Sequence, residues 1–390
     1  MNAFRDNTFA EKAIKESLHS NSRNMGVELF RIVSMLLVVL LHIVGHGGVI
    51  SAAVPLSVNY KIATFLQVLA YCSVNCYALI SGFANVKTSF KFRRFIYLWL
   101  ETVFLVAFVN IITPMFADGF EITREWWING LFPLTKREFW YLCAYFLMYP
   151  LILLMNHGLN VIKQWQHIAV IILLQMPTIF RLIDGSDNYA LGGGYSAMWL
   201  ICLYVMGAYF RIYGAPRWAK WYVTLPAFFV SCCIAFFVKI IPEERLYAGL
   251  IENSSSWYEN REMLISYISP CMVIMSLMLL LFFMQLKING KLVRCVISEL
   301  GRATWGVFVI HVSSAIWYLN DFWRRFSSIA DKKPIVMLAS LLVSATFWYL
   351  VFSLISIGRV YLFKLCRVNH AVELVADRFT EMLEGKKDEA

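Results

Sequence analysis

Charged side chains are scarce in this chain: they make up 15% of its 390 residues, whereas soluble domains carry about 25%. Hydrophobic residues account for 59%, and apolar blocks recur from Leu29 to Ile357. This composition excludes an ordinary soluble domain. The short alternating segments of a transmembrane barrel are also missing. The sequence therefore predicts an all-α, polytopic membrane protein with about ten transmembrane helices. The expected spans are roughly 27–46, 60–83, 95–116, 139–156, 167–183, 194–210, 222–242, 262–285, 303–320 and 335–358.

No segment is large and polar enough to form a separate soluble catalytic domain. Residues 1–24 are expected to be a polar cytoplasmic tail, 25–365 one membrane domain, and 366–390 a charged cytoplasmic tail. A cleavable signal peptide is not expected, because residues 1–24 are polar and mixed in charge. Any chemistry is therefore expected in the membrane helices and their loops.

Two kinds of ligand motif are missing. The nine cysteines form no Cys/His quartet with zinc spacing, so no metal site is predicted. The run Gly192–Gly194 lacks the residues that follow a P-loop, so it is interpreted as a flexible turn. Trp126, Trp127 and Trp140 are typical of an interfacial aromatic belt; stacking against a substrate is the alternative.

The positive charge is unevenly distributed. The net charge is +10, and the segments on the expected inner side hold 22 Lys and Arg residues against 9 outside. The positive-inside rule then predicts that both termini are cytoplasmic. The charge is interpreted as a consequence of the lipid bilayer, and no nucleic-acid partner is predicted.

The first span contains two ionisable residues, Arg31 and His42, where such groups are costly and often functional. Eleven residues of helix turn through 1100°, only about 20° more than three full turns, so both side chains lie on one face, roughly 16 Å apart. An imidazole exchanges protons near neutral pH, and His42 is a candidate general base. The alternative is a buried histidine that hydrogen-bonds to a neighbouring helix.

Arg31 is expected near the cytoplasmic end of this span, where a guanidinium binds phosphate through two hydrogen bonds. Two alternatives explain the position of Arg31 equally well: its side chain snorkels to the membrane surface, or it pairs with Glu28. A basic segment follows the second span, with Lys87, Lys91, Arg93 and Arg94. It is either an ordinary cytoplasmic loop or, together with Arg31, the mouth of a site for a phosphorylated donor.

Three residues are candidates for supporting roles: Glu28, Ser81 and His311. Ser81 precedes Gly82 at the end of the second span, where a small pair permits close helix packing or a backbone break near a ligand. His311 lies within the ninth expected span and is predicted to be neutral. Packing and support of catalysis both fit His311.

The Arg31-X10-His42 spacing resembles the hallmark of the acyltransferase-3 superfamily of integral membrane acyltransferases, which modify polysaccharides and other glycans. The segments ELFRIVSMLLVVLLH, VNCYALISGF, FKFRRF and GVFVIH are similar to further family patterns. The resemblance covers about residues 25–365. At the family's Arg-X-X-Arg motif this chain has Lys91 in place of the first arginine. The hydrolase-like domain that some members carry is not expected in this chain.

The resemblance implies an O-acyltransferase of the bacterial cytoplasmic (inner) membrane, with His42 as the catalytic residue. Arg31, Lys91, Arg93 and Arg94 would hold a cytosolic acyl-CoA, expected to be acetyl-CoA, as co-substrate and not as a permanently bound cofactor. The acceptor would be a hydroxyl of a cell-surface or lipid-linked glycan. Other proteins of surface-polysaccharide assembly are possible further partners.

A proton- or solute-coupled membrane transporter is the rival interpretation. Such a protein would use the same intramembrane histidine and arginine side chains as relay or substrate groups. The absence of an evident repeat between the two halves of the chain argues mildly against it.

Overall fold

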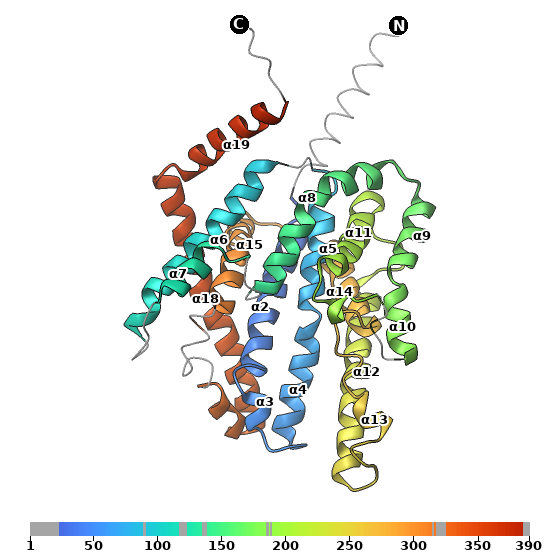
Figure 1. Ribbon diagram of the computed structural model, residues 1–390. Coiled ribbons are helices and arrows are strands. Elements are labelled where there is room, and N and C mark those ends of the chain that lie inside the picture. Colours follow the sequence, from blue (N-terminus) through green and yellow to red (C-terminus); the bar gives the residue numbers. More distant parts are fainter. Residues whose placement is uncertain are drawn as a thin grey trace, which may run out of the picture.

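The structure is a computed structural model that describes residues 23–88, 91–116, 123–134, 139–184, 187, 189–313, 316 and 325–384. Within these ranges every regular element is a helix (Figure 1). The elements are α2 (Met25–Val44), α3 (Val49–Ala52), α4 (Val58–Tyr71), α5 (Ser73–Asn85), α6 (Phe92–Ile112), η1 (Thr113–Met115), α7 (Arg124–Leu131), α8 (Trp140–Val161), α9 (Gln164–Leu174), α10 (Met176–Asp184), η3 (Gly192–Gly194), α11 (Ala197–Tyr213), α12 (Trp221–Tyr247), α13 (Ser256–Glu259), α14 (Pro270–Phe283), α15 (Lys291–Val312), η4 (Ser327–Asp331), α18 (Pro334–Leu365) and α19 (Val368–Glu384).

Seven helical segments of the described chain are long and apolar enough to cross a membrane. They are Met25–Ala52, Val58–Asn85, Phe92–Met115, Trp140–Val161, Trp221–Tyr247, Lys291–Val312 and Pro334–Leu365. The shorter apolar helices α11 and α14 accompany them. The helices run between one end that carries α19 and an opposite end that carries α3 and α13 (Figure 1). We call these the α19 end and the α3 end. The predicted all-α, polytopic membrane fold is confirmed.

Polar caps set where several helices begin. The Asn24 side chain accepts a hydrogen bond from Val27 N and donates one to Met284 O, which fastens the start of α2 to the end of α14. Ser196 and Ser269 cap α11 and α14 in the same way, as short polar side chains do at N-caps. Both helices therefore begin later than the predicted spans 194–210 and 262–285.

Two predicted spans are each divided into two helices. The second, expected at 60–83, breaks at Cys72 between α4 and α5. The fifth, expected at 167–183, breaks at Gln175 between α9 and α10. Pro177 follows that break and cannot donate the backbone hydrogen bond that would continue α9.

Close packing of α5 against α11 depends on two glycines. A Cβ at Gly82 would overlap the Tyr204 carbonyl oxygen, and a Cβ at Gly207 would overlap that of Leu79. Small residues allow this approach of two backbones in membrane proteins. Of the two roles predicted for the Ser81-Gly82 pair, the structure therefore shows close helix packing.

The predicted ninth span, 303–320, is misplaced. Helix α15 begins at Lys291 and ends at Val312, and residues 314, 315 and 317–324 lie outside the described part of the chain. The charges in the first half of α15 concealed its helical start. Lys291 and Arg294 are exposed there, so the helix carries them without burying charge.

Buried apolar residues form two clusters. One gathers α5, α8, α11, α12 and α14, and the other gathers α6, α15 and α18. Helix α2 contributes to both, with Phe30 in the first cluster and Val39 in the second. This places α2 between the two halves of the bundle, where both of its sides contact protein.

The structure describes most of the predicted C-terminal tail but little of the predicted N-terminal tail. Of the 1–24 tail, residues 1–22 lie outside the described part of the chain. Most of the 366–390 tail forms α19, which packs on α6: Phe379 stacks on Phe92 with ring centroids 4.4 Å apart, and Glu373 pairs with Arg93.

Candidate active site

A cavity of about 1160 Å³ lies between the two halves of the bundle. Its wall is built mainly by α2, α5, α8 and α15, with residues from α4, α6 and α18. Arginines line it toward the α19 end, and histidines and aromatic rings line it toward the α3 end. The polar and aromatic lining residues are Arg23, Arg31, His42, His46, Gln67, Tyr71, Tyr77, Ser81, Asn85, Tyr97, Glu101, Phe139, Trp140, Tyr141, Tyr145, Tyr195, Tyr267, Arg302, Thr304, Trp305, Phe308 and Arg359.

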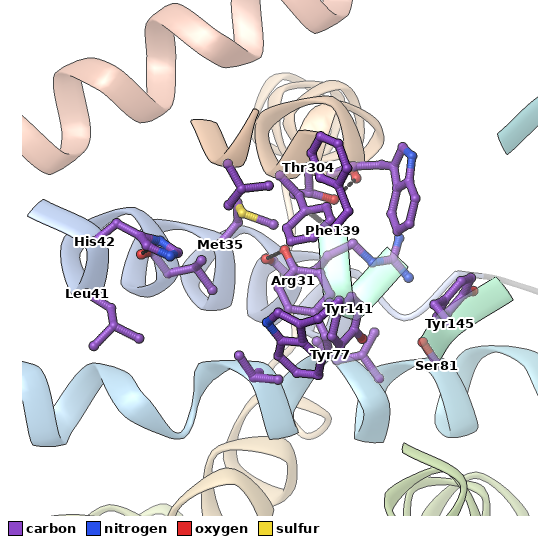
Figure 2. A pocket seen from close by; sticks show the side chains of 18 of the residues that line it. Arg31, Met35, Leu41, His42, Tyr77, Ser81, Phe139, Tyr141, Tyr145 and Thr304 are labelled. Atoms are coloured by element: carbon purple, nitrogen blue, oxygen red, sulfur yellow. Dashed lines mark hydrogen bonds between the residues drawn. The ribbon is translucent and has the colours of Figure 1, made fainter. Parts of the chain in front are cut away.

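Helix α2 presents Arg31 and His42 to this one cavity, with Met35 and Val38 between them. The spacing of eleven residues predicted a shared face, and the structure confirms it. Figure 2 shows Arg31, Met35 and His42 along α2, with Tyr77 and Tyr141 of the neighbouring helices around the same space.

His42 contacts His311 of α15. Nε2 of His311 lies 3.2 Å from Nδ1 of His42, and the ring centroids are 4.9 Å apart in an edge-on arrangement. His46 stacks on His42 with ring centroids 5.2 Å apart. His311 is completely buried, whereas His42 is partly accessible from the cavity. Within the described residues, no group of three or more His, Cys, Asp or Glu side chains is arranged to hold a metal ion.

The hydrogen bonds around the two rings determine where their protons lie. Nδ1 of His311 is 2.7 Å from the Val307 carbonyl oxygen, and Nδ1 of His42 is 3.0 Å from that of Val38. A carbonyl oxygen only accepts, so each Nδ1 carries the hydrogen. The Nδ1–H of His42 is then shared with His311, whose Nε2 accepts it. This network leaves Nε2 as the basic nitrogen of His42.

Four arginines line the opposite part of the cavity: Arg23, Arg31, Arg302 and Arg359. Arg31 donates to the Glu28 carboxylate at 2.9 Å, as its position three residues along the helix allows. Arg302 pairs with Glu299 at 2.8 Å, with half of its side chain exposed. Arg359 is buried and pairs with Glu101, so it is committed to a protein partner. Arg23, Arg31 and Arg302 remain accessible to an anionic ligand.

The basic segment after α5 lies apart from the cavity wall. Lys91 caps α6 and is exposed, and Arg93 pairs with Glu373 at 3.0 Å. Arg94 lies close to the Tyr149 hydroxyl group. None of the three is among the described residues that line the cavity. The structure thus brings His42, Arg31 and Ser81 to one cavity, with Glu28 and His311 directly behind.

Sequence patterns did not single out Arg302 or Tyr141. Arg302 fell in a presumed loop, because the start of α15 was not recognised. Tyr141 resembled one more aromatic residue of an apolar span, yet its buried hydroxyl has no hydrogen-bond partner among the described residues. A buried hydroxyl left unpaired costs about 1–3 kcal/mol, which an acceptor group of a bound ligand would recover.

Comparison with known proteins identifies the chain. The model of the acyltransferase-3 family, described as an acyltransferase domain, matches residues 24–357. No curated protein and no solved structure matches the chain. The match covers nearly all of the bundle and every residue of the cavity except Arg23, Arg359 and Val360. The chain therefore belongs to the acyltransferase-3 family and is a multi-pass membrane acyltransferase.

Proposed function

We propose that this acyltransferase moves an acetyl group from cytosolic acetyl-CoA to a hydroxyl of a cell-surface or lipid-linked glycan. The observation that carries the proposal is the cavity itself. It has accessible arginines toward one end and a histidine, oriented by a second histidine, toward the other. Arginines suit the phosphates of a nucleotide donor, and an oriented imidazole suits proton transfer from a hydroxyl.

The chemistry follows from the protonation state of His42. Its Nε2 takes the proton of the acceptor hydroxyl while the hydroxyl oxygen attacks the thioester carbonyl carbon. The carbon–sulfur bond then breaks, and the proton passes from His42 to the leaving sulfur. The products are the ester and CoA. Binding both reactants in one cavity supplies much of the rate, because the encounter is no longer bimolecular.

The dimensions of the cavity suit a CoA thioester. Arg31 and His42 are separated by roughly 16 Å along α2, which is comparable with an extended pantetheine arm. In this proposal Arg23, Arg31 and Arg302 contact the phosphates. Lys91, Arg93 and Arg94 stand outside the wall and attract the anionic donor through their field.

Arg302→Ala is expected to raise the KM for acetyl-CoA about tenfold. A charge-assisted hydrogen bond is worth about 1.5–3 kcal/mol, and the lower end applies to an exposed side chain. Initial rates of CoA release at varied acetyl-CoA concentration measure the effect. Arg294→Ala is the matched control, because Arg294 lies exposed on the same helix but not at the cavity. Equal effects of both variants would contradict a phosphate contact by Arg302.

The proposed topology has the α19 end in the cytoplasm of a bacterial inner membrane, in agreement with the distribution of Lys and Arg residues. Two native cysteines, Cys295 and Cys366, are exposed and lie toward that end. A membrane-impermeant maleimide should leave both unlabelled in intact spheroplasts and label them after lysis, as read by mass spectrometry. Ser255→Cys, beside α13, should be labelled in intact spheroplasts. The reverse pattern would invert the topology.

The function itself is tested with the purified full chain in nanodiscs. Acetyl-CoA labelled in the acetyl group should release CoA and transfer the label to an added alcohol. Uptake of a solute into sealed proteoliposomes containing the protein, without any release of CoA, would favour a transporter instead. Extracting surface glycans from cells with and without the protein, and weighing their acyl substituents, then identifies the natural acceptor.

A further inference from the structure

Four aromatic rings form a packed group in the cavity wall toward the α3 end. Tyr71 stacks on Tyr267 with centroids 4.7 Å apart, and Tyr195 packs on Trp140 at 4.5 Å and on Tyr267 at 4.9 Å. All four residues line the cavity that contains His42. They come from four separate parts of the chain, so only the folded bundle assembles them. We call Tyr71, Trp140, Tyr195 and Tyr267 the aromatic platform.

The run Gly192–Gly194 builds one side of this platform. All three glycines have left-handed φ angles, of 62°, 66° and 101°, which side chains rarely allow. Both oxygens of Asp187 accept backbone hydrogen bonds, from Leu191 N and Gly193 N, each at 2.9 Å. A Cβ at Gly194 would overlap the side chain of Tyr267. The turn is therefore fixed, not flexible as its composition suggested, and it holds Tyr195 against Tyr267.

The other side of the platform is fixed as firmly. Asn75 is fully buried, donates to the Tyr267 carbonyl oxygen at 2.8 Å, and accepts from the indole N–H of Trp199 at 3.1 Å. Ser266 donates to the Gly193 carbonyl oxygen at 3.1 Å, which ties the two loops together. Buried polar networks of this kind fix one arrangement.

The platform lies at the same depth as the candidate base. Tyr71 is thirteen residues into α4 and His42 seventeen into α2, so each is about 20–25 Å from the start of its helix. The two antiparallel segments, Met25–Ala52 and Val58–Asn85, are equally long, which places both residues near mid-height. Irregular backbone at this depth occurs where it is buried in protein or lines a cavity. The loops that carry Tyr195 and Tyr267 meet this description.

An aromatic belt does not explain the platform. Belt residues face lipid at the membrane surface, whereas Tyr267 is only 4% exposed and faces a cavity. Tyr71 and Trp140 cover the ring of Tyr267, whereas Tyr195 lines the cavity and is 49% exposed, so Tyr195 offers the accessible ring of the platform. Phenol hydroxyls and the Gln67 amide add hydrogen-bonding groups at the same wall, which suit a polyhydroxylated ligand better than an acyl chain.

We propose that the aromatic platform, held by the Gly192–Gly194 turn, is the acceptor subsite and binds the flat C–H face of a pyranose ring beside His42. This inference rests on the proposed transfer to a glycan. Aromatic faces carry partial negative charge and attract the C–H groups of a sugar ring. The platform would thereby select a cyclic sugar over an open-chain alcohol of similar reactivity.

The test compares three alcohols as acceptors for the full-length protein in nanodiscs with labelled acetyl-CoA: methyl β-D-glucopyranoside, glycerol and choline. The readout is kcat/KM for the glucoside divided by that for glycerol. Wild type should prefer the glucoside. Tyr195→Ala and Trp140→Ala should each lower the ratio about 2- to 12-fold, the range for one aromatic contact. Tyr195→Phe should retain it. Trp127→Ala, on α7 and outside the cavity wall, is the matched control and should also retain it.

Each outcome is decisive. No glucoside preference in wild type, or an unchanged ratio in both alanine variants, overturns the pyranose subsite while leaving acyl transfer intact. A choline preference that the alanine variants lose would instead make the platform a cation site and would also overturn the proposal. Release of CoA without transfer to any of the three alcohols would contradict the proposed function itself.

Discussion

His42→Ala should lower kcat for acetyl transfer by about 10²- to 10⁴-fold, the usual contribution of a general base. The imidazole lines the cavity and its Nε2 is the basic nitrogen, because Nδ1 donates to Val38 O and His311. Alanine removes that nitrogen and leaves the helix intact, since alanine has the best helix propensity. The measurement is the rate of ester formation by purified protein in nanodiscs.

The control for His42→Ala is His157→Ala. His157 is exposed on α8 and lies outside the cavity that contains His42. Both variants should purify as single species with similar thermal unfolding. If His42→Ala keeps a rate within a few-fold of wild type at equal protein levels, His42 is not the base, and the proton must pass to another group of the cavity.

The second large effect is expected at His311, which does not line the cavity and acts through His42. His311→Leu removes the acceptor of the His42 Nδ1–H bond and fills a similar volume. The loss of a buried hydrogen bond costs about 1–3 kcal/mol, so kcat should fall about 5- to 150-fold. The KM for acetyl-CoA should change little, because the arginines that are proposed to hold the donor are far along the cavity.

Conservative variants of His311 show whether its side chain orients the His42 ring or only fills space between α2 and α15. The amide oxygen of His311→Gln reaches about as far as Nε2 and should restore most of kcat. His311→Asn reaches only as far as Nδ1 and should remain as slow as His311→Leu. Equal rates for Gln, Asn and Leu would show that the side chain serves only to fill space between α2 and α15.

Much of the fold was predictable because membrane helices have strong local signals. The long apolar segments of α2, α6 and α18 are visible without any tertiary information. The prediction failed at α15, where Arg294 and Arg302 interrupt the apolar pattern; one is exposed and the other faces the cavity, so neither charge is buried. It also could not foresee the breaks at Cys72 and Gln175, which hydropathy does not report.

In the candidate site too, the sequence predicts what lies within one helix and not what tertiary packing brings together. Arg31 and His42 share one helix, so their common face follows from helical geometry alone. Sequence patterns also suggested His311, but its contact with His42 depends on how α15 packs against α2. The aromatic platform combines residues from distant segments, and the Gly192–Gly194 turn looked flexible because the partners that fix it, Asp187 and Ser266, are not part of a local motif.

The two histidine rings are each bonded to a carbonyl of their own helix, His42 to Val38 in α2 and His311 to Val307 in α15. Neither helix therefore has to unfold for the 3.2 Å contact between the rings to be lost. A slide of about 2 Å of one helix along the other carries that contact beyond hydrogen-bonding distance, while every backbone bond of both helices persists. Circular dichroism would report such a protein as intact after a harsh detergent extraction, although its kcat would be lowered as in His311→Leu. We therefore expect turnover to depend on lateral pressure and bilayer thickness, so the choice of lipid belongs among the variables of any assay.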